Sequence, residues 1–142
     1  MAIADSTPVV PDGIVETRES VRSGGGRRAV LGAAAVAAVG LVLIALPGWP
    51  LGAIGFLLVV MAAPALPVVG VPAVSGPVFY AIGAVGSAVV WWIVGSIAGR
   101  RAAKRAVADW SDWRRELIPF AVGISLGGIV ALVLGTIVLG TF

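Results

Sequence analysis

Charge is confined to two short parts of this chain, and this segregation constrains the fold more than any other feature. The ten basic and seven acidic residues all lie in 1–28 and 100–116, so 29–99 and 117–142 carry none. Charged residues make up 12% of the sequence, against about 25% in an ordinary soluble domain. Charged side chains are costly inside a bilayer, so long charge-free stretches are typical of membrane-spanning segments. The sequence therefore predicts an all-α integral membrane protein.

The chain is expected to divide into a polar tail and a transmembrane domain. Residues 1–28 contain two prolines, charges of both signs and the run Gly24–Gly26. Such a segment buries little apolar surface, which predicts a flexible N-terminal tail. A short helix around Val15–Val21 is an alternative for part of it. Residues 29–142 form the predicted transmembrane domain.

Three segments of the predicted domain are long and apolar enough to cross a bilayer. Residues 29–46 are eighteen uncharged residues, which as a helix would span about 27 Å of the ~30 Å hydrocarbon core. Residues 78–98 and 118–141 are the second and third crossings. Pro119 would lie in the first turn of the last crossing, where proline is tolerated.

Prolines interrupt the region between the first two crossings. Pro50 and Pro64 enclose thirteen apolar residues, which as a helix would span only about 20 Å. Because proline ends helices, 47–77 is predicted to be a re-entrant hairpin or a short fourth hydrophobic segment. The residues expected to shape this hairpin are Pro47, Gly48, Trp49, Pro50, Pro64 and Pro67.

The second charged segment, 100–116, is predicted to be an amphipathic interfacial helix. Its apolar residues recur at spacings of three and four, and tryptophan is favoured at the level of the lipid headgroups. The residues expected to contact headgroups are Arg100, Arg101, Lys104, Arg105, Trp110 and Trp113.

The positions of the basic residues favour one topology. Basic residues near membrane crossings tend to stay in the cytoplasm, so 18–28 and 100–115 should lie on the same side. This favours three crossings plus a re-entrant 47–77, with the N-terminus cytoplasmic and the C-terminus outside. The alternative is four full crossings with both termini inside, which would leave the basic residues of 100–105 outside.

Small residues at four-residue spacing predict close helix packing. Within a membrane such residues let two helix backbones approach closely. One pair is Gly95 and Gly99. A longer stripe follows in the last crossing, at Gly123, Gly127, Ala131 and Gly135.

The apolar segments offer little reactive chemistry. The chain has no Cys and no His, and its charge-free segments hold hydroxyl groups but no carboxylate or base. We therefore expect no catalytic residues, no cofactor, no metal site and no nucleic-acid partner. The expected partners are membrane lipids and either other membrane-protein subunits or further copies of this chain.

Two families resemble parts of the sequence. The segment Leu46-Pro47-Gly48-Trp49-Pro50 and the apolar run after it resemble small actinobacterial membrane proteins with a Pro-Gly-Pro-Gly-Trp motif, over about residues 30–63. The stretch with Trp110, Trp113, Arg114 and Arg115 is similar to a later linker of that family, although one Pro-Gly pair of the motif is missing.

The second resemblance is to one half of the DedA-type (VTT-domain) membrane proteins. It depends on a Pro-rich segment followed by Gly83-Ala84-Val85-Gly86-Ser87 and by the junction Gly99-Arg100. That resemblance implies a role in lipid transport. This chain departs from the pattern because 47–77 holds no acidic residue and a second half is missing.

The function predicted from these observations is that of a non-catalytic accessory or stabilising subunit of a larger membrane complex. The alternatives are a lipid-handling protein and a holin-like oligomeric pore. The bias toward Ala, Gly, Val and Arg suggests a bacterial plasma membrane.

Overall fold

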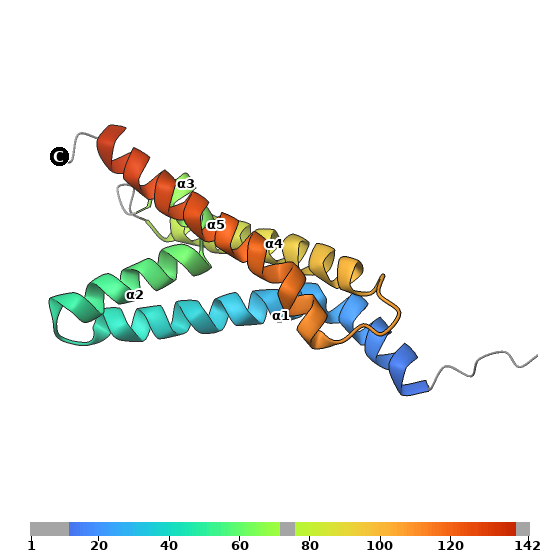
Figure 1. The fold of residues 1–142 in the computed structure, drawn as a ribbon. Helices are drawn as coiled ribbons and strands as arrows, with labels where there is room; N and C mark the ends of the chain where they lie inside the picture. The colour runs from blue at the N-terminus through green and yellow to red at the C-terminus, as the bar shows by residue number, and fades with distance from the viewer. Residues whose placement is uncertain (1–11, 72–75, 139–142) are drawn as a thin grey trace, which may run out of the picture.

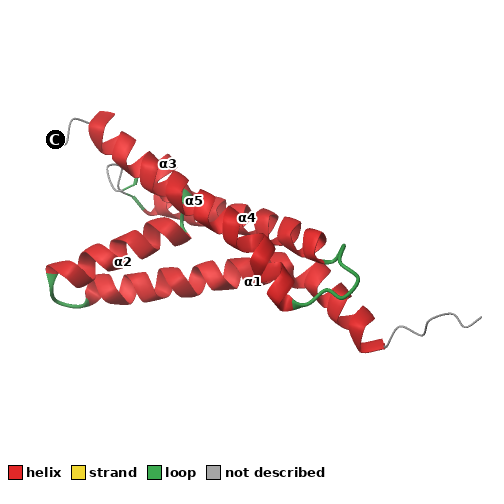
Figure 2. Cartoon of the chain, in the orientation of Figure 1, coloured by secondary structure: helices red, strands yellow, loops and turns green. Residues whose placement is uncertain are grey.

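The computed structural model describes residues 12–71 and 76–138. It contains the helices α1 (Asp12–Ala45), α2 (Trp49–Ala62), α3 (Ala65–Val68), α4 (Pro77–Ala102) and α5 (Trp110–Val138). Throughout these residues the regular structure is helical (Figure 2). The predicted all-α class is therefore confirmed for the described residues.

Three helices are long and apolar enough to cross a membrane, as predicted. They run over Gly13–Ala45, Pro77–Ala102 and Trp110–Val138. Large apolar side chains cover their outer surfaces, as expected for a protein surrounded by lipid. Helix α2 has 14 residues and is only about 21 Å long, short of the ~30 Å core. The length and composition of these three helices indicate a multi-pass membrane protein.

The long helices pack with their charged segments at one end of the molecule. Helix α4 returns antiparallel to α1, and α5 runs back over α4, α2 and α3 toward the opposite end (Figure 1). The Arg18 side chain donates a hydrogen bond from Nε to the carbonyl oxygen of Ala103 at 2.6 Å. Residues 12–28 therefore lie beside the α4–α5 connection, although they are far from it in sequence.

Helix α1 begins much earlier than expected. It is continuous from Asp12 to Ala45, so residues 12–28 are helical and the prediction of a flexible tail is corrected there. Residues 1–11 lie outside the described residues. The reason is that Gly24–Gly26 face α4 and α5 at close range, so these glycines allow helices to approach rather than the backbone to bend.

A separate interfacial helix over 100–116 is absent from the described residues. Helix α4 extends to Ala102, residues 103–109 form a connection, and 110–116 are the first two turns of α5. The sequence itself interrupts the expected helix, because Asp109 caps a new helix through its side chain. Pro119 consequently lies inside α5 and not in a first turn.

The Pro-rich region folds into α2, α3 and their connections. Gly48, with φ of 120°, precedes α2 in a backbone conformation that favours glycine. Helix α2 returns along α1 for part of its length, and α3 then lies against the first half of α4 (Figure 1). Pro72 and the last residues of the third predicted crossing, 139–141, lie outside the described residues.

Candidate functional site

A close helix contact joins α1 and α4 through glycines. A Cβ atom added to Gly25 would lie 2.5 Å from the carbonyl oxygen of Gly95, and one added to Gly26 would lie 2.5 Å from Ser96 Oγ. One added to Gly99 would lie 2.6 Å from a backbone carbonyl oxygen of α1. No side chain fits in these gaps, so glycine is what permits this crossing. The predicted packing residues Gly95 and Gly99 thus both lie against α1.

Two tryptophans attach α5 to this crossing. Trp113 is buried and donates a hydrogen bond from Nε1 to the carbonyl oxygen of Gly95 at 3.1 Å. Trp110 packs edge-on against Trp113 with ring centroids 5.8 Å apart. The guanidinium of Arg28 stacks 3.5 Å above the Trp110 ring, which joins α1 to the start of α5. Both tryptophans were predicted to face headgroups, and both make contacts within the protein.

A second buried contact holds the end of α2 beside α4. Trp91 donates a hydrogen bond from Nε1 to the carbonyl oxygen of Ala62 at 2.7 Å. The hydroxyl of Ser87 accepts a hydrogen bond from the backbone N–H of Ala65 at 3.1 Å and donates one to the carbonyl oxygen of Gly83 at 2.7 Å. These bonds satisfy backbone groups where α2 ends and α3 begins, which matters where water is excluded.

The four basic residues predicted to contact headgroups, Arg100, Arg101, Lys104 and Arg105, lie at the end of α4 and in the connection that follows it. Arg100 and Arg101 form its last turn, and Arg101 also lies over the Phe120 ring at 5.1 Å. Lys104 and Arg105 are exposed in the connection to α5.

The connection between α4 and α5 is fixed by charged groups. Arg105 forms ion pairs with Asp112 and Glu116 in the first turns of α5. Asp109 Oδ1 accepts hydrogen bonds from the backbone N–H groups of Ser111 and Asp112, at 2.8 and 2.9 Å. The hydroxyl of Ser111 and the backbone N–H of Asp112 lower the pKa of the Asp109 carboxyl, and the charge of Arg114 adds to this effect.

The predicted small-residue stripe of α5 has a different environment. A Cβ atom on Gly123, Gly127 or Gly135 would meet nothing within 4 Å. Ala131, the fourth member, is half-buried. In contrast, Gly128 is buried beside Val60 and Pro64. The inner side of α5 therefore packs on α2 and α3, while the stripe faces away from the other described helices.

The residues predicted to shape the hairpin lie at the ends of α2 and α3. Pro47 and Gly48 form the turn after α1, and Trp49 and Pro50 begin α2. Pro64 precedes α3 and Pro67 lies within it. Trp49, the first residue of α2, is 84% exposed. The turn between α1 and α2 lies at the end of the molecule opposite the α4–α5 connection (Figure 1).

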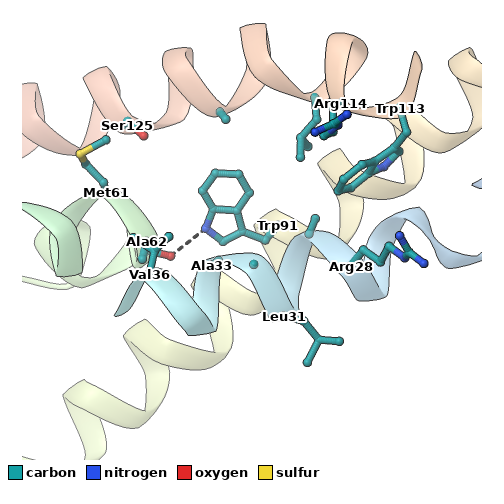
Figure 3. A pocket seen from close by; sticks show the side chains of 14 residues that line it. Arg28, Leu31, Ala33, Val36, Met61, Ala62, Trp91, Trp113, Arg114 and Ser125 are labelled. Atoms are coloured by element: carbon teal, nitrogen blue, oxygen red, sulfur yellow. Dashed lines mark hydrogen bonds between the residues drawn. The ribbon is translucent and has the colours of Figure 1, made fainter. Parts of the chain in front are cut away.

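A pocket of about 600 Å³ opens between α1, the end of α2, α4 and α5. Trp91 lies in the middle of it, with its Nε1 turned toward Ala62 (Figure 3). Arg28 and Arg114 are the charged residues of its lining. The remaining lining residues are Ala29, Leu31, Gly32, Ala33, Val36, Met61, Ala62, Trp113, Leu117, Ala121 and Ser125.

Sequence reasoning missed several of these residues. Gly24–Gly26 could have been found from the sequence. Gly95 and Gly99 form one small-residue helix surface, and the glycine run offers a second surface of the same kind for it to pack against. The capping pattern of Asp109 and Asp112 was also readable, as acidic residues three apart at a helix start. No sequence signal pairs Trp91 with Ala62, since that contact depends on the path of α2.

Comparison of the chain with protein-family models, with curated proteins and with solved structures finds no match. The two family resemblances therefore stay predictions. Among the described residues, no group of three or more Asp or Glu side chains could hold a metal ion.

Proposed function

We propose that this protein is a non-catalytic accessory subunit of a larger membrane complex and that the outer face of α5 receives a helix of its partner. The observation that carries the proposal is the open space beside Gly123, Gly127 and Gly135. Helices in lipid associate by close van der Waals packing, and small residues allow that approach.

The rest of the chain supports a partner for this face. Where glycines of α1 meet glycines of α4, the gap is filled by backbone from the same chain. Helix α5 has only Trp113 and Gly128 buried among its described residues. A partner helix with small residues of its own would give the stripe on α5 the packing that α1 and α4 already have.

The proposed topology has three crossings, formed by α1, α4 and α5, and a re-entrant segment formed by α2 and α3. The position of Ala62 beside Trp91 supports it. Trp91 precedes Arg100 on α4 by roughly 13 Å of helix, so α2 ends well before the charged end of the molecule. A fourth full crossing would bring the end of α2 to that charged end.

The proposed location is a bacterial plasma membrane with the N-terminus in the cytoplasm. The basic residues at the ends of α1 and α4 lie at one end of the molecule (Figure 1), where the positive-inside bias would keep them cytoplasmic. There, Arg100, Arg101 and Lys104 would meet anionic headgroups.

The test of the docking face is a quantitative pull-down of the tagged chain from its native membrane in mild detergent. We expect foreign subunits in fixed stoichiometry with the wild type, and their loss with Gly127→Leu. The matched control is Gly52→Leu, because a Cβ on Gly52 also meets nothing within 4 Å. A chain recovered alone as a homo-oligomer would contradict the accessory role and favour the holin-like pore.

The topology is tested by labelling single cysteines in a chain that has none. Cysteines at Trp49 and Val138, both exposed, should react from the outer side, and one at Lys104 from the cytoplasmic side. Four crossings would instead put Trp49 and Lys104 on one side and Val138 on the other.

A further inference from the structure

The pocket around Trp91 has an apolar interior and two arginines in its lining, Arg28 and Arg114, and the Arg28 side chain extends away from Trp91 (Figure 3). Its lining residues come from α1, α2, α4 and α5. The lining includes no Asp or Glu. We propose that this pocket binds one anionic phospholipid, with an acyl chain against Trp91 and the phosphate held by Arg28 and Arg114.

Both guanidinium groups keep N–H donors that a phosphate could use, although the charge of Arg114 also acts on the Asp109 carboxyl. Neither Arg28 nor Arg114 forms an ion pair with a described residue. Arg28 stacks on Trp110 through the face of its guanidinium, which leaves the N–H donors in the plane of the group for an oxyanion. Two arginines at one pocket can donate hydrogen bonds to both non-bridging oxygens of a phosphodiester and attract its single negative charge.

The interior of the pocket suits an acyl chain. The indole N–H groups of Trp91 and Trp113 are both used in hydrogen bonds to backbone carbonyl oxygens. The tryptophans therefore present carbon surface, and Ser125 is the one hydroxyl in the lining. The volume of about 600 Å³ lies in the usual range of ligand pockets.

The pocket has its arginines at one end and apolar lining along its length, which is also how the headgroup and the acyl chain of a lipid are arranged in a bilayer. Arg28 and Arg114 lie where the charged segments meet the charge-free ones. From Arg114 the lining continues along α5 to Ser125, which is roughly 16 Å of helix. The headgroup would thus lie at the charged end of the molecule and the chain would follow the helices inward.

A neighbouring basic surface lacks this combination. The pocket formed by α1 and the end of α4 is lined by Arg18, Arg22, Arg100 and Lys104, but also by Glu19. Its aliphatic lining residues are Val15 and Ala103. That surface offers charge to headgroups without an interior for an acyl chain, which makes it a suitable control.

The experiment measures lipid binding to the purified full-length chain by native mass spectrometry, titrating phosphatidylglycerol or phosphatidylcholine. We expect a 1:1 complex with phosphatidylglycerol at least about tenfold tighter than with phosphatidylcholine, given two arginine contacts. The double variant Arg28→Gln with Arg114→Gln should remove this preference. Arg28→Lys with Arg114→Lys should retain part of it.

The control removes the same charge from the neighbouring surface, by Arg18→Gln with Arg22→Gln. It should leave the preference for phosphatidylglycerol intact. Equal losses in the two double variants would overturn the proposal, since binding would then reflect general basic charge. Equal affinity of the wild type for both lipids would overturn it as well.

The acyl-chain part of the site is tested by narrowing the pocket without touching the arginines. A Cβ on Gly32 meets nothing within 4 Å, and Gly32 lines the pocket, so we expect the side chain of Gly32→Leu to narrow it. We expect phosphatidylglycerol binding to fall in Gly32→Leu and to persist in Gly52→Leu. Unchanged binding in a folded Gly32→Leu, with wild-type circular dichroism, would contradict the assigned position of the chain.

Discussion

The glycines of this protein have two opposite environments. At the crossing of α1 and α4, backbone of one helix fills the space beside glycines of the other, as with Gly25 and Gly95. On the outer face of α5, the space beside Gly123 and Gly127 is open. The same residue type therefore builds the packing of the chain in one place and leaves a surface available in the other.

This difference separates what holds the protein together from what it offers to other molecules. The buried apolar cluster includes Val21, Ala29 and Ala98 with Trp91 and Trp113, all around the α1–α4 crossing. The small residues on the outer face of α5, Gly123, Gly127, Ala131 and Gly135, are not part of this cluster. Substitutions at the crossing should change stability, and those on the outer face should change association.

The largest effect is expected at the crossing. In Gly95→Leu the new side chain would collide with Ala29 and with the backbone of Gly25. Overpacking of this kind costs about 1–3 kcal/mol or more, and backbone cannot move aside as a side chain can. Thermal unfolding in detergent, followed by near-ultraviolet circular dichroism, should show a large loss of stability. Gly127→Leu is the matched control, and equal destabilisation in both would break the comparison.

The next effect concerns the bond that fixes the end of α2. Trp91→Phe removes the donor to the Ala62 carbonyl oxygen, and an unsatisfied buried acceptor costs about 1–3 kcal/mol. Hydrogen exchange in α2 should become faster. Trp92→Phe is the control, because Trp92 is 56% exposed. If α2 exchanges at the same rate in both variants, the Trp91 bond does not hold the segment.

A smaller effect is expected at the connection that orients α5. Arg105→Gln removes the ion pairs to Asp112 and Glu116. Because these side chains are partly exposed, the loss should be about 1 kcal/mol or less, measured as a shift of the unfolding temperature. Arg115→Gln, with the same charge change and no ion pair among the described residues, should shift it less.

The smallest effect is a pH dependence at the start of α5. The pKa of Asp109 is lowered in the folded protein, first by the Ser111 hydroxyl. The stabilisation is therefore present above the ordinary value of 3.8 and is lost as the pH falls through the lowered pKa. The unfolding temperatures of the wild type and Asp109→Asn should differ at pH 7 and converge in acid. A difference that stays constant with pH would exclude this contribution.

Much of the fold could be predicted because charge and hydropathy act locally along the chain. As far as the structure describes them, the charge-free stretches predicted as crossings, 29–46, 78–98 and 118–141, lie almost entirely within α1, α4 and α5. The predicted start of the first helix was wrong, because packing against other helices outweighs the local amino-acid composition there. Residues 12–28 look flexible by composition, yet Gly24–Gly26 are held against α4 and α5 and the segment is helical.

The candidate sites were less predictable because they depend on which helices meet. The stripe of Gly123 and Gly127 is a local pattern, but only the packed structure distinguishes an open face from a filled one. Arg28 and Arg114 lie far apart in sequence, and their shared pocket follows from the antiparallel return of α4 and α5. The sequence predicts that Trp110 and Trp113 contact lipid headgroups, but it gives no sign of the partner that each has within the chain.

Helix α1 has one further consequence, which is mechanical. It runs without a break from Asp12 to Ala45, so its polar and apolar halves cannot rotate independently. Any rotation imposed on residues 12–28 would also turn the apolar half of the helix. It would therefore reach the turn between α1 and α2, which lies about 26 Å farther along the helix. In the proposed topology, this unbroken helix would transmit a rotation of residues 12–28 to the α1–α2 turn.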